Sequence, residues 1–377
     1  MSQFPQLKVI ARSSAFEYKN KNIDLKEVSD ALGVQAVLTG RVAQRDDDLL
    51  VSVELVNARD RTQIWGERYS RKAADIQGIE KEITRAISEK LRLRLSGAQE
   101  QQLAKRATQN PVAYELYLTG VFYYRQPGLE GIKKSLDYFD QAITLDPNFA
   151  PAWVEVGRVN NYLAGNSVVN PKEPLAKAKA ALQQALALDE TLPDAHLELA
   201  RIKHSEWNWR EAENEYLRAM ELNGNLAEAH SRYSPYLSLM GRHTEALAEN
   251  KRAQELDPLR IGLRRQEAVA LSLARRHDEA VEKAERAMSL EQPNHGNSYF
   301  GLALIYESNG MYQQAIESYR KAISILGETT SLQCYLGYTL AMSGKRKEAQ
   351  SILHKLKTTK EYVSPTELAN ASGWAGR

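Results

Sequence analysis

The side chains best suited to chemistry in this 377-residue chain are seven histidines, one cysteine and a run of three aspartates. His196 and His230 are 34 residues apart, as are His243 and His277. Because metal-binding histidines usually lie a few residues apart, this spacing indicates one repeated structural position and not a metal site. The carboxylates of Asp46-Asp47-Asp48 would suit a hard cation, but no glycine-pinned loop surrounds them, and we interpret them as the tip of a hairpin.

The apolar surroundings of the one cysteine and the absence of known catalytic motifs argue against an enzyme. Cys334 lies in the apolar stretch Leu332–Leu336, where a cysteine packs more often than it reacts. The sequence contains no glycine-rich phosphate loop followed by Lys-Ser/Thr, no His-Glu-x-x-His, no Gly-x-Ser-x-Gly and no kinase catalytic-loop signature. We therefore expect no catalytic residue, no metal and no cofactor.

The composition is that of a globular chain with little net charge. Lys and Arg number 50 and Asp and Glu 48, so the formal net charge is +2. Because nucleic-acid binding needs a clustered cationic surplus, we expect no nucleic-acid partner. No apolar run reaches the roughly 18 to 20 residues that span a bilayer, and no signal peptide opens the sequence. These features favour a cytoplasmic location, with an extracytoplasmic one as the alternative if the chain is a fragment of a membrane-anchored protein.

Small residues recur along the chain with a period of about 34 residues, which is the signature of a repeat array. The first series is Ala178, Ala212, Ala246, Ala280, Ala315 and Ala349, the second is Ala185, Ala219, Ala253, Ala287 and Ala322, and the third is Gly157, Ala200, Ala268, Ala303 and Gly337. The second series follows the first by seven residues, which returns a side chain to the same helical face after two turns. The pattern predicts pairs of short amphipathic helices that approach closely and are stable only when stacked.

These units resemble the tetratricopeptide repeat, whose pattern is a large residue, Leu-Gly, Tyr, Ala, Phe or Tyr, Ala and Pro. The matching residues are Trp153, Val156, Gly157, Leu182 and Ala185 in one unit and Leu302, Ala303, Tyr306, Ala315, Tyr319 and Ala322 in another. The resemblance implies a mostly α fold, in which a right-handed helical solenoid of about seven units occupies residues 111–360. An insertion near 165–174 should loop between two helices, and Pro235 should kink its helix.

Residues 1–95 show a different pattern of apolar and polar residues, which predicts a small α/β domain. The β-rich runs are Ala36–Gln44, Leu49–Asn57 and Thr62–Tyr69, joined by polar turns. They predict an antiparallel meander. Asp24 and Gly33 bracket a capped helix, and apolar residues at helical spacing from Ile76 to Leu91 predict a long helix that closes the domain. We interpret residues 96–110 as a helical linker and 361–377 as a tail or an incomplete final helix.

This first domain is similar to the domain related to the TolB amino-terminal domain. The similar stretches are Leu7–Phe16, Leu32–Val42 and Ile64–Tyr69. In bacteria the domain commonly precedes tetratricopeptide repeats in signalling proteins, behind a serine/threonine kinase, an adenylate cyclase or a winged-helix regulator. The resemblance thus implies the non-catalytic half of such a protein. The family usually begins with one more strand and helix ahead of Phe4, which this domain is expected to lack. Because an uncovered sheet edge readily pairs with another chain, we expect residues 5–70 either to be poorly ordered or to form the contact of a homodimer.

The resemblance also implies a binding surface, since the first helices of tetratricopeptide repeats line a concave groove. The corresponding positions are Tyr117, Tyr124, Arg158, Asn161, Arg201, His204 and Arg265. Arginine binds carboxylates through several donors and tyrosine offers rigid contact area, so we expect a protein or peptide ligand of acidic character. Arg158 and Arg201 share a register in adjacent repeats and should form a positive strip. The other interpretation is that these residues solvate the groove or pack on the neighbouring repeat.

Two alternatives to an interaction scaffold come from other classes of protein. One is a hydrolytic or other enzyme with a site between the α/β domain and the solenoid, around Trp65–Arg68. An elevated pKa of Glu67 in a closed pocket would support it, whereas an exposed Glu67 on an edge strand would refute it. The other alternative is part of a transcriptional regulator, although no helix-turn-helix with a basic recognition face is visible.

Overall fold

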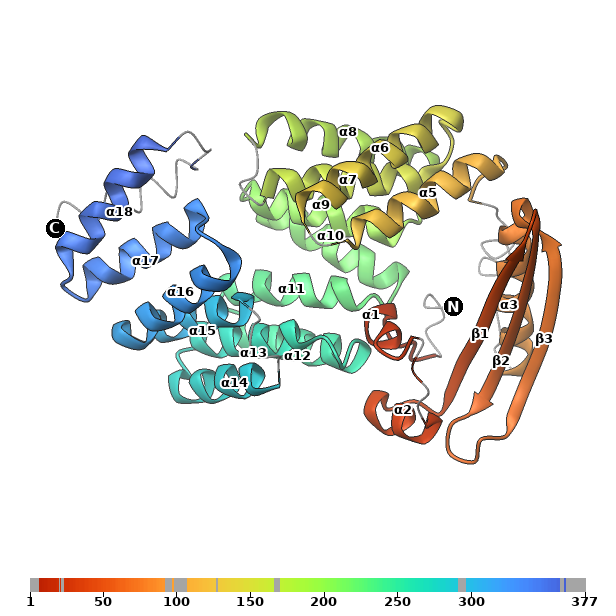
Figure 1. Cartoon of the computed structure of the whole chain (residues 1–377), viewed down its shortest axis with the longest axis horizontal. Helices are drawn as coiled ribbons and strands as arrows, with labels where there is room; N and C mark the ends of the chain where they lie inside the picture. Colours follow the sequence, from red (N-terminus) through yellow and green to blue (C-terminus); the bar gives the residue numbers. More distant parts are fainter. Residues whose placement is uncertain are drawn as a thin grey trace. The chain divides into compact units, whose positions relative to one another are not determined.

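The computed structural model describes residues 7–19, 21, 24–91, 97, 107–126, 128–165, 170–290, 296–359 and 363. The chain divides into two compact units, residues 1–161 with 175–226 and residues 162–174 with 227–377. Helices dominate, and a small three-stranded sheet precedes most of them in the sequence (Figure 1). The fold is therefore mostly α, as the sequence predicts. The expected linker at 96–110 and tail at 361–377 lie mostly outside the described residues, so these boundaries stay predictions.

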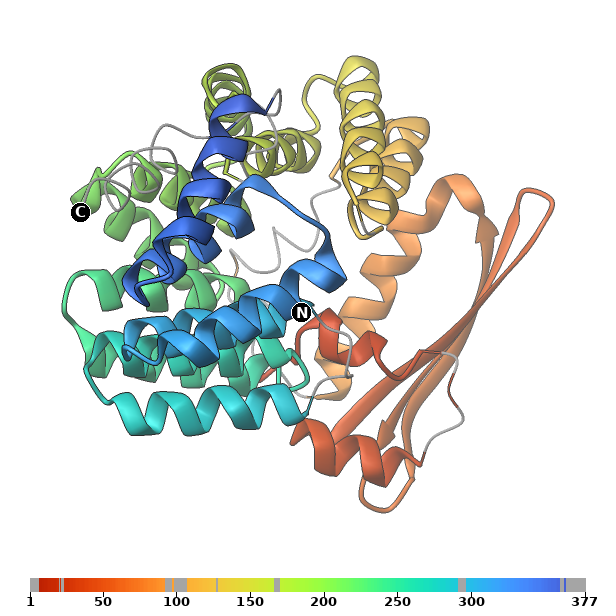
Figure 2. The ribbon, with the colours of Figure 1, turned by 60° about the vertical axis from the view of Figure 1, so that its left-hand side comes forward.

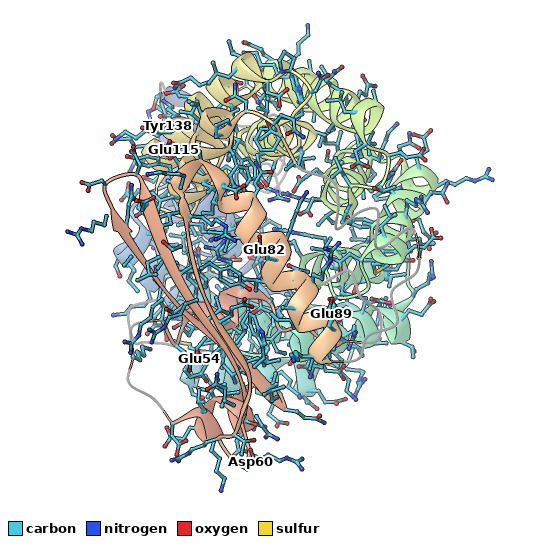
Figure 3. The ribbon with its side chains drawn as sticks, turned by 90° about the vertical axis from the view of Figure 1, so that its right-hand side faces the viewer. Glu54, Asp60, Glu82, Glu89, Glu115 and Tyr138 are labelled. Carbon is cyan, nitrogen blue, oxygen red and sulfur yellow. The ribbon has the colours of Figure 1, made fainter. Side chains whose placement is uncertain are left out.

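The first part of the chain forms an antiparallel meander in the order β1-β2-β3, with one long helix along a face of it (Figures 2 and 3). Its elements are α1 (Arg12–Phe16), α2 (Leu25–Leu32), β1 (Ala36–Arg45), β2 (Asp48–Asn57), β3 (Gln63–Lys72), the 3-10 turn η1 (Ala73–Asp75) and α3 (Ile76–Lys90). The Asp24 carboxylate accepts a hydrogen bond from the Lys26 N–H at 3.0 Å, and α2 ends at Gly33 with φ of 62°. The predicted capped helix and the hairpin tip at Asp46 are thus present.

The core of the sheet lies between β2 and α3. Leu49, Val51, Val53 and Leu55 are each no more than 8% exposed, and the first three pack with residues of α3. Alternate residues of a strand point to one face, so these four residues all face the helix. The opposite face carries Glu54, which is exposed (Figure 3).

The edge strand β1 leaves apolar side chains uncovered on the helix-facing side of the sheet. Val42 pairs with Val51, and Leu38 pairs with Leu55, across the β1–β2 ladder. Although paired residues share a face, Val42 is 67% exposed and Leu38 46%, against 8% and 4% for their partners. In the described part of the chain no strand lies beyond β1. This edge is a surface that another strand can join.

From residue 111 onward the described chain is helical and forms seven consecutive helix pairs. The first helices of the pairs are α5 (Pro111–Tyr124), α7 (Ala150–Gly165), α9 (Pro193–Ser205), α11 (Ala227–Leu239), α13 (Ile261–Leu273), α15 (Gly296–Ser308) and α17 (Thr330–Met342). The second helices are α6 (Leu129–Leu145), α8 (Lys172–Leu188), α10 (Trp209–Leu222), α12 (His243–Leu256), α14 (His277–Ser289), α16 (Tyr312–Leu326) and α18 (Arg346–Thr358). α11 continues through Pro235, and the expected kink stays a prediction. None of the helices described is both long enough and apolar enough to cross a membrane.

The recurring small residues lie where helices of the solenoid approach one another. Every member of the two alanine series is at most 1% exposed. At Gly157 an added Cβ would lie 2.6 Å from the Cγ of Leu182, which is too close even for a methyl group. The period of 34 residues therefore predicts the close-contact positions correctly.

The turn inside each of five repeats needs a left-handed backbone at one fixed position. The residues there are Trp207, Gly241, Arg275, Gly310 and Gly344, with φ between 60° and 84°. Glycine adopts this conformation freely, whereas other residues are destabilised in it by roughly 1–2 kcal/mol. Two turns thus retain a strained side chain where the others have glycine.

The insertion near 165–174 lengthens both helices of its repeat as well as the connection between them. α7 has 16 residues and α8 has 17, compared with 13 in α9 and 14 in α10. Just before α8, the Oδ1 of Asn170 accepts a hydrogen bond from the Lys172 N–H at 3.1 Å. Residues 166–169 lie outside the described residues. The insertion is a helix connection, as predicted, but part of its length is helical.

Candidate functional site

The first helices of two adjacent repeats, α7 and α9, bring five charged side chains together, which we call the arginine cluster. Its members are Arg158 and Glu155 on α7 and Asp194, Glu198 and Arg201 on α9. Spacings of three and four residues place these side chains on one face of each helix. The cluster lies in the first compact unit.

Arg158 directs all three of its guanidinium nitrogens to carboxylates. Nη1 lies 2.8 Å from Glu155, Nη2 lies 2.5 Å from Asp194, and Nε lies 3.3 Å from Glu198. The side chain is 21% exposed. Multi-donor contacts of this kind are strong and geometrically specific, so Arg158 ties α7 to α9.

Glu198 is the centre of the cluster, because it contacts both arginines and an asparagine. Its side chain is 2% exposed. It accepts hydrogen bonds from Arg201 Nη1 at 2.8 Å and from Asn161 Nδ2 at 2.9 Å. The predicted residues Arg158, Asn161 and Arg201 are thus side by side, and all three are bound to the same buried carboxylate.

The arginine cluster is not the positive strip that the sequence suggests. Two guanidinium groups face three carboxylates, so their charge is neutralised within the protein. Asp194 and Glu198 reach Arg158 only because the two repeats stack, and the sequence alone does not show that contact. The polar side chains of these first helices therefore join neighbouring repeats as well as facing solvent.

Arg201 nevertheless keeps donors for a ligand. Both of its contacts with Glu198 use Nη1, and its Nε and Nη2 have no partner within the described ranges. The side chain is 22% exposed. A guanidinium that is held at one nitrogen and open at the others is already oriented toward a carboxylate or a backbone carbonyl.

Burial also changes the titration of groups in and beside the cluster. It raises the pKa of Glu155 to about 7, against the opposing effect of Arg158. Burial likewise raises the pKa of Tyr124 to about 12, and the charges of Arg158 and Glu198 also act on that hydroxyl. Tyr124 on α5 is therefore close to the arginine cluster.

Tyr117 and His204 pack against aromatic side chains. The ring of Tyr117 lies 5.9 Å from that of Phe139 and 5.1 Å from that of Phe149, and burial raises its pKa. The ring of His204 lies 5.5 Å from that of Trp209, and burial lowers its pKa. These contacts agree with the packing interpretation of both residues.

Arg265 lies in the second compact unit, where its Nη1 donates to the Ser298 hydroxyl at 3.0 Å, from α13 to α15. The same unit contains a second neutralised carboxylate. Burial raises the pKa of Glu228, but Arg232 and Arg260 outweigh it and bring the pKa to about 2. Contacts between successive first helices therefore recur along the solenoid.

Sequence reasoning missed the acidic members of the arginine cluster, although a signal was present. Glu155 precedes Arg158 by three residues, and Glu198 precedes Arg201 by three, a spacing that favours ion pairs on a helix. Neutralised arginines could therefore have been expected within each helix, but not between helices.

One of the two histidine pairs, His196 and His230, repeats a structural contact, as its spacing predicts; the other does not, because His277 Nδ1 contacts Asn309 whereas His243 Nδ1 has no hydrogen-bond partner among the residues described. His196 Nδ1 lies 2.6 Å from Glu215, and His230 Nδ1 lies 2.5 Å from Glu249. The two contacts are one repeat apart. Cys334 is buried in a hydrophobic cluster whose residues come from α15 to α18. No group of three or more potential metal ligands comes together among the residues described.

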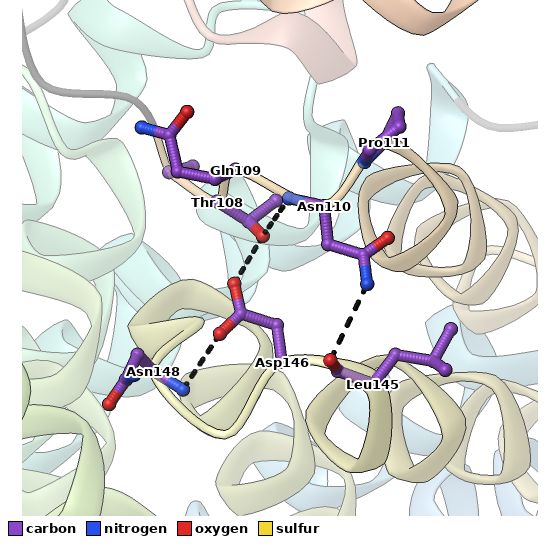
Figure 4. A pocket seen from close by; sticks show the side chains of 8 residues that line it. Thr108, Gln109, Asn110, Pro111, Leu145, Asp146 and Asn148 are labelled. Carbon is purple, nitrogen blue, oxygen red and sulfur yellow. Dashed lines mark hydrogen bonds between the residues drawn. The ribbon is translucent and has the colours of Figure 1, made fainter.

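A surface pocket at the start of the solenoid has its polar groups engaged with one another (Figure 4). The residues that line it are Ala107, Thr108, Gln109, Asn110, Pro111, Leu145, Asp146 and Asn148. Asp146 accepts hydrogen bonds from the Thr108 hydroxyl and from the Asn148 N–H, the latter at 3.0 Å. Asn110 Nδ2 reaches the Leu145 carbonyl at 3.4 Å. These bonds close the first repeat.

The alternative catalytic site around Trp65–Arg68 lacks the enclosed glutamate that it requires. Glu67 lies on the edge strand β3, where it is exposed and accepts a hydrogen bond from the Tyr69 hydroxyl at 3.0 Å. A general acid or base with a shifted pKa needs an enclosed environment. The structure therefore contradicts the proposal of catalysis at this position.

Comparison with known proteins supports the repeat assignment. Residues 296–326, which form α15 and α16, match the family model of the tetratricopeptide repeat. The crystal structure of a tetratricopeptide repeat protein from Parabacteroides merdae ATCC 43184 has a TM-score of 0.53 and 14% identity, covering 71% of this chain and 99% of that one. The APC/C hetero-tetramer Cut9-Hcn1 has a TM-score of 0.50 and 15% identity, covering 71% and 54%. The solenoid thus has the fold of tetratricopeptide-repeat proteins.

One curated relative matches about half of this chain. It is a protein of Rhizobium meliloti (strain 1021) named "Putative adenylate cyclase 3", with 30% identity over 202 residues. The match covers 53% of this chain and 34% of the relative. The chain therefore spans about a third of the length of the curated relative that it matches.

Proposed function

We propose that this chain is a non-catalytic interaction scaffold whose first helices bind a protein or peptide. Its repeat fold supports an interaction role, since stacked helix pairs present an extended surface to partners. The observation that carries the proposal is Arg201, which is fixed by Glu198 through one nitrogen and offers two others to a ligand. We call the face formed by Tyr124, Arg158, Asn161 and Arg201 the first-helix surface.

The proposed ligand offers an oxygen acceptor to Arg201. A carboxylate is the strongest such acceptor, because the hydrogen bond is then charge-assisted, and this is the remaining basis for an acidic ligand. Arg158 adds little free charge, since its three nitrogens already contact carboxylates. The expected discrimination between acidic and neutral peptides thus depends on one residue.

The Arg201→Ala variant tests this proposal against a matched control. Arg218 on α10 is also a partly exposed arginine held by a carboxylate, 2.7 Å from Glu221, but it belongs to a second helix. A partner co-purified from cell extract should bind Arg201→Ala about 10- to 150-fold more weakly, because a charge-assisted contact contributes about 1.5–3 kcal/mol. Arg218→Ala should bind normally. Equal binding by the two variants would contradict the proposal.

We place this scaffold in bacterial signalling, in the cytoplasm. The similarity of residues 4–95 to the TolB-related domain and the relative named as an adenylate cyclase support this context. The matching region would then be a non-catalytic part of that relative. The purified chain should accordingly form no cyclic AMP from ATP, and cell fractionation should find it with cytoplasmic markers. Cyclase activity of the chain alone would refute the scaffold proposal.

We also propose that two copies pair through β1. Its ten residues are bonded on one side, and Leu38 and Val42 expose apolar surface beside the open edge. A second β1 in antiparallel orientation would pair with the N–H and C=O groups of the open edge and cover these side chains. The resulting dimer would carry two solenoids and hence two binding surfaces.

A further inference from the structure

The face of the sheet opposite α3 carries an exposed apolar side chain with small neighbours. Alternate residues of β2 point away from α3, and Leu50, which is 49% exposed, is one of them. Its partners across the two ladders are Ala43 on β1 and Ser70 on β3, and both are exposed. Because these partners are small, a large part of Leu50 stays open to contact from outside the sheet.

Four cations surround Leu50 on the same face, at the corners of a rectangle. They belong to two rows of paired residues, which lie two residues to either side of Leu50. The rows are Arg41, Ser52 and Arg68 on one side and Arg45, Asp48 and Lys72 on the other. Paired residues share a face, so all four cations point away from α3. We call Leu50 with these four cations the basic face.

Three of the four cations keep their charge unpaired. Lys72 contacts the Asp48 carboxylate at 2.9 Å. The exposed Arg41, Arg45 and Arg68, in contrast, make no ion pair or hydrogen bond within the part of the chain that the structure describes. Many arginines of the solenoid are instead held by carboxylates. The basic face thus offers guanidinium donors that the protein itself does not use.

The spacing of the basic face matches an extended polypeptide. Arg41 and Arg45 are four residues apart on β1, which corresponds to about 14 Å along the strand. In an extended peptide, side chains four residues apart have the same separation, and the side chain midway between them points to the same side. Acidic residues at the two outer positions would reach the arginines, and an apolar residue at the middle position would lie over Leu50. Arg68 and Lys72 repeat this spacing on β3.

We propose that the basic face binds an extended acidic segment of a partner protein, in which two acidic residues lie four positions apart with an apolar residue midway between them. This surface belongs to the sheet and is distinct from the first-helix surface, so the chain would hold two different segments. A membrane with acidic lipids would also attract the cations. However, Asp48 and the exposed Glu54 share the face and would repel a continuous layer of negative headgroups, whereas a peptide can place its carboxylates away from them.

Methyl NMR of the full chain with labelled leucines tests this proposal, because it detects weak binding at single side chains. The probe is a peptide with two glutamates four positions apart, a leucine midway between them and threonine elsewhere. The methyl signals of Leu50 should shift on titration, and those of Leu49, which is buried on the other face, should not. In a control peptide the leucine is moved by one position, which turns it away from the sheet when the glutamates face it. This peptide should bind about 3- to 5-fold more weakly.

The double variant Arg41→Gln with Arg45→Gln should bind the probe about 5- to 10-fold more weakly, because each exposed ion pair contributes roughly two- to threefold in affinity. The matched control removes two exposed cations from α3, Arg85→Gln with Lys90→Gln, and should bind normally. If the first variant does not fold, a probe with glutamine in place of both glutamates tests the same contacts on the unaltered chain and should show the same loss.

Three results would overturn the inference. The first is equal binding of the probe and the peptide with the displaced leucine. The second is an equal loss in the two double variants, or no loss with the glutamine probe, since the arginines of the face would then have no specific role. The third is a shift of Leu50 with vesicles of phosphatidylglycerol but not with the probe, which would assign the basic face to a membrane surface.

Discussion

Replacing Arg275 by glycine should stabilise the solenoid. Arg275 occupies the left-handed turn position between α13 and α14, with φ of 60°, where three of the other repeats have glycine. Relief of a left-handed backbone is worth roughly 1–2 kcal/mol, and the added freedom of glycine in the unfolded chain offsets about 0.5–1 kcal/mol of it. The net gain should be about 0.5–1 kcal/mol. The side chain of Arg275 is exposed, so little packing is lost.

The matched control is Arg275→Ala, which removes the same side chain but keeps the Cβ that causes the strain. Urea unfolding followed by circular dichroism should show a higher midpoint for Arg275→Gly and almost no change for Arg275→Ala. Hydrogen exchange should place the gain in α13 and α14, because repeats contact mainly their neighbours. An equal gain in both variants would refute the reasoning, since the cause would then be the lost arginine and not the backbone.

Three further predictions concern the arginine cluster, the repeat core and the sheet edge. Burial raises the pKa of Glu155 from 4.5 to about 7, so between these pH values the folded chain binds more protons than the unfolded chain. The free energy of unfolding should therefore fall by up to about 3 kcal/mol as the pH rises through this window. In urea unfolding, Glu155→Gln should flatten this pH dependence, and an unaltered slope would contradict the assignment to Glu155. Gly157→Ala should cost about 1–3 kcal/mol through overpacking, whereas Gly165→Ala, whose Cβ would meet nothing within 4 Å, should be nearly neutral; similar thermal midpoints for the two variants would contradict the close contact. Leu38→Lys with Val42→Lys should abolish the β1 dimer in sedimentation velocity, and a monomeric parent chain would exclude that dimer.

The helix pairs and the meander could be predicted because their signals are local and repeated. The alanines 34 residues apart identify the close contacts, and alternation from Leu49 to Leu55 identifies the buried face of β2. The observed strand ends differ from the predicted ones by up to three residues, since β3 extends to Lys72 and not only to Tyr69. The left-handed position of Trp207 was also accessible, because Gly241 and Gly344 mark the same register in the sequence.

The electrostatics of the candidate site could not be predicted to the same degree. Arg158 and Arg201 were placed correctly as neighbours on successive first helices, but Asp194 neutralises Arg158 only through the stacking of two repeats. The charge of a surface depends on such contacts between elements, whereas its residue types depend on sequence alone. The contact of Leu7 with Asn225 is of the same kind, because no sequence period links the two positions.

Site-specific photo-crosslinking tests the first-helix surface most directly. A photoreactive phenylalanine analogue would replace Tyr124 on α5 in one variant and Tyr138 on α6 in another; both side chains are aromatic and half-buried. In cells that produce each variant, irradiation should join a partner protein to position 124 and not to position 138, because only the former lies beside the arginine cluster. Crosslinks at position 138 alone, or equally at both positions, would contradict binding through the first helices.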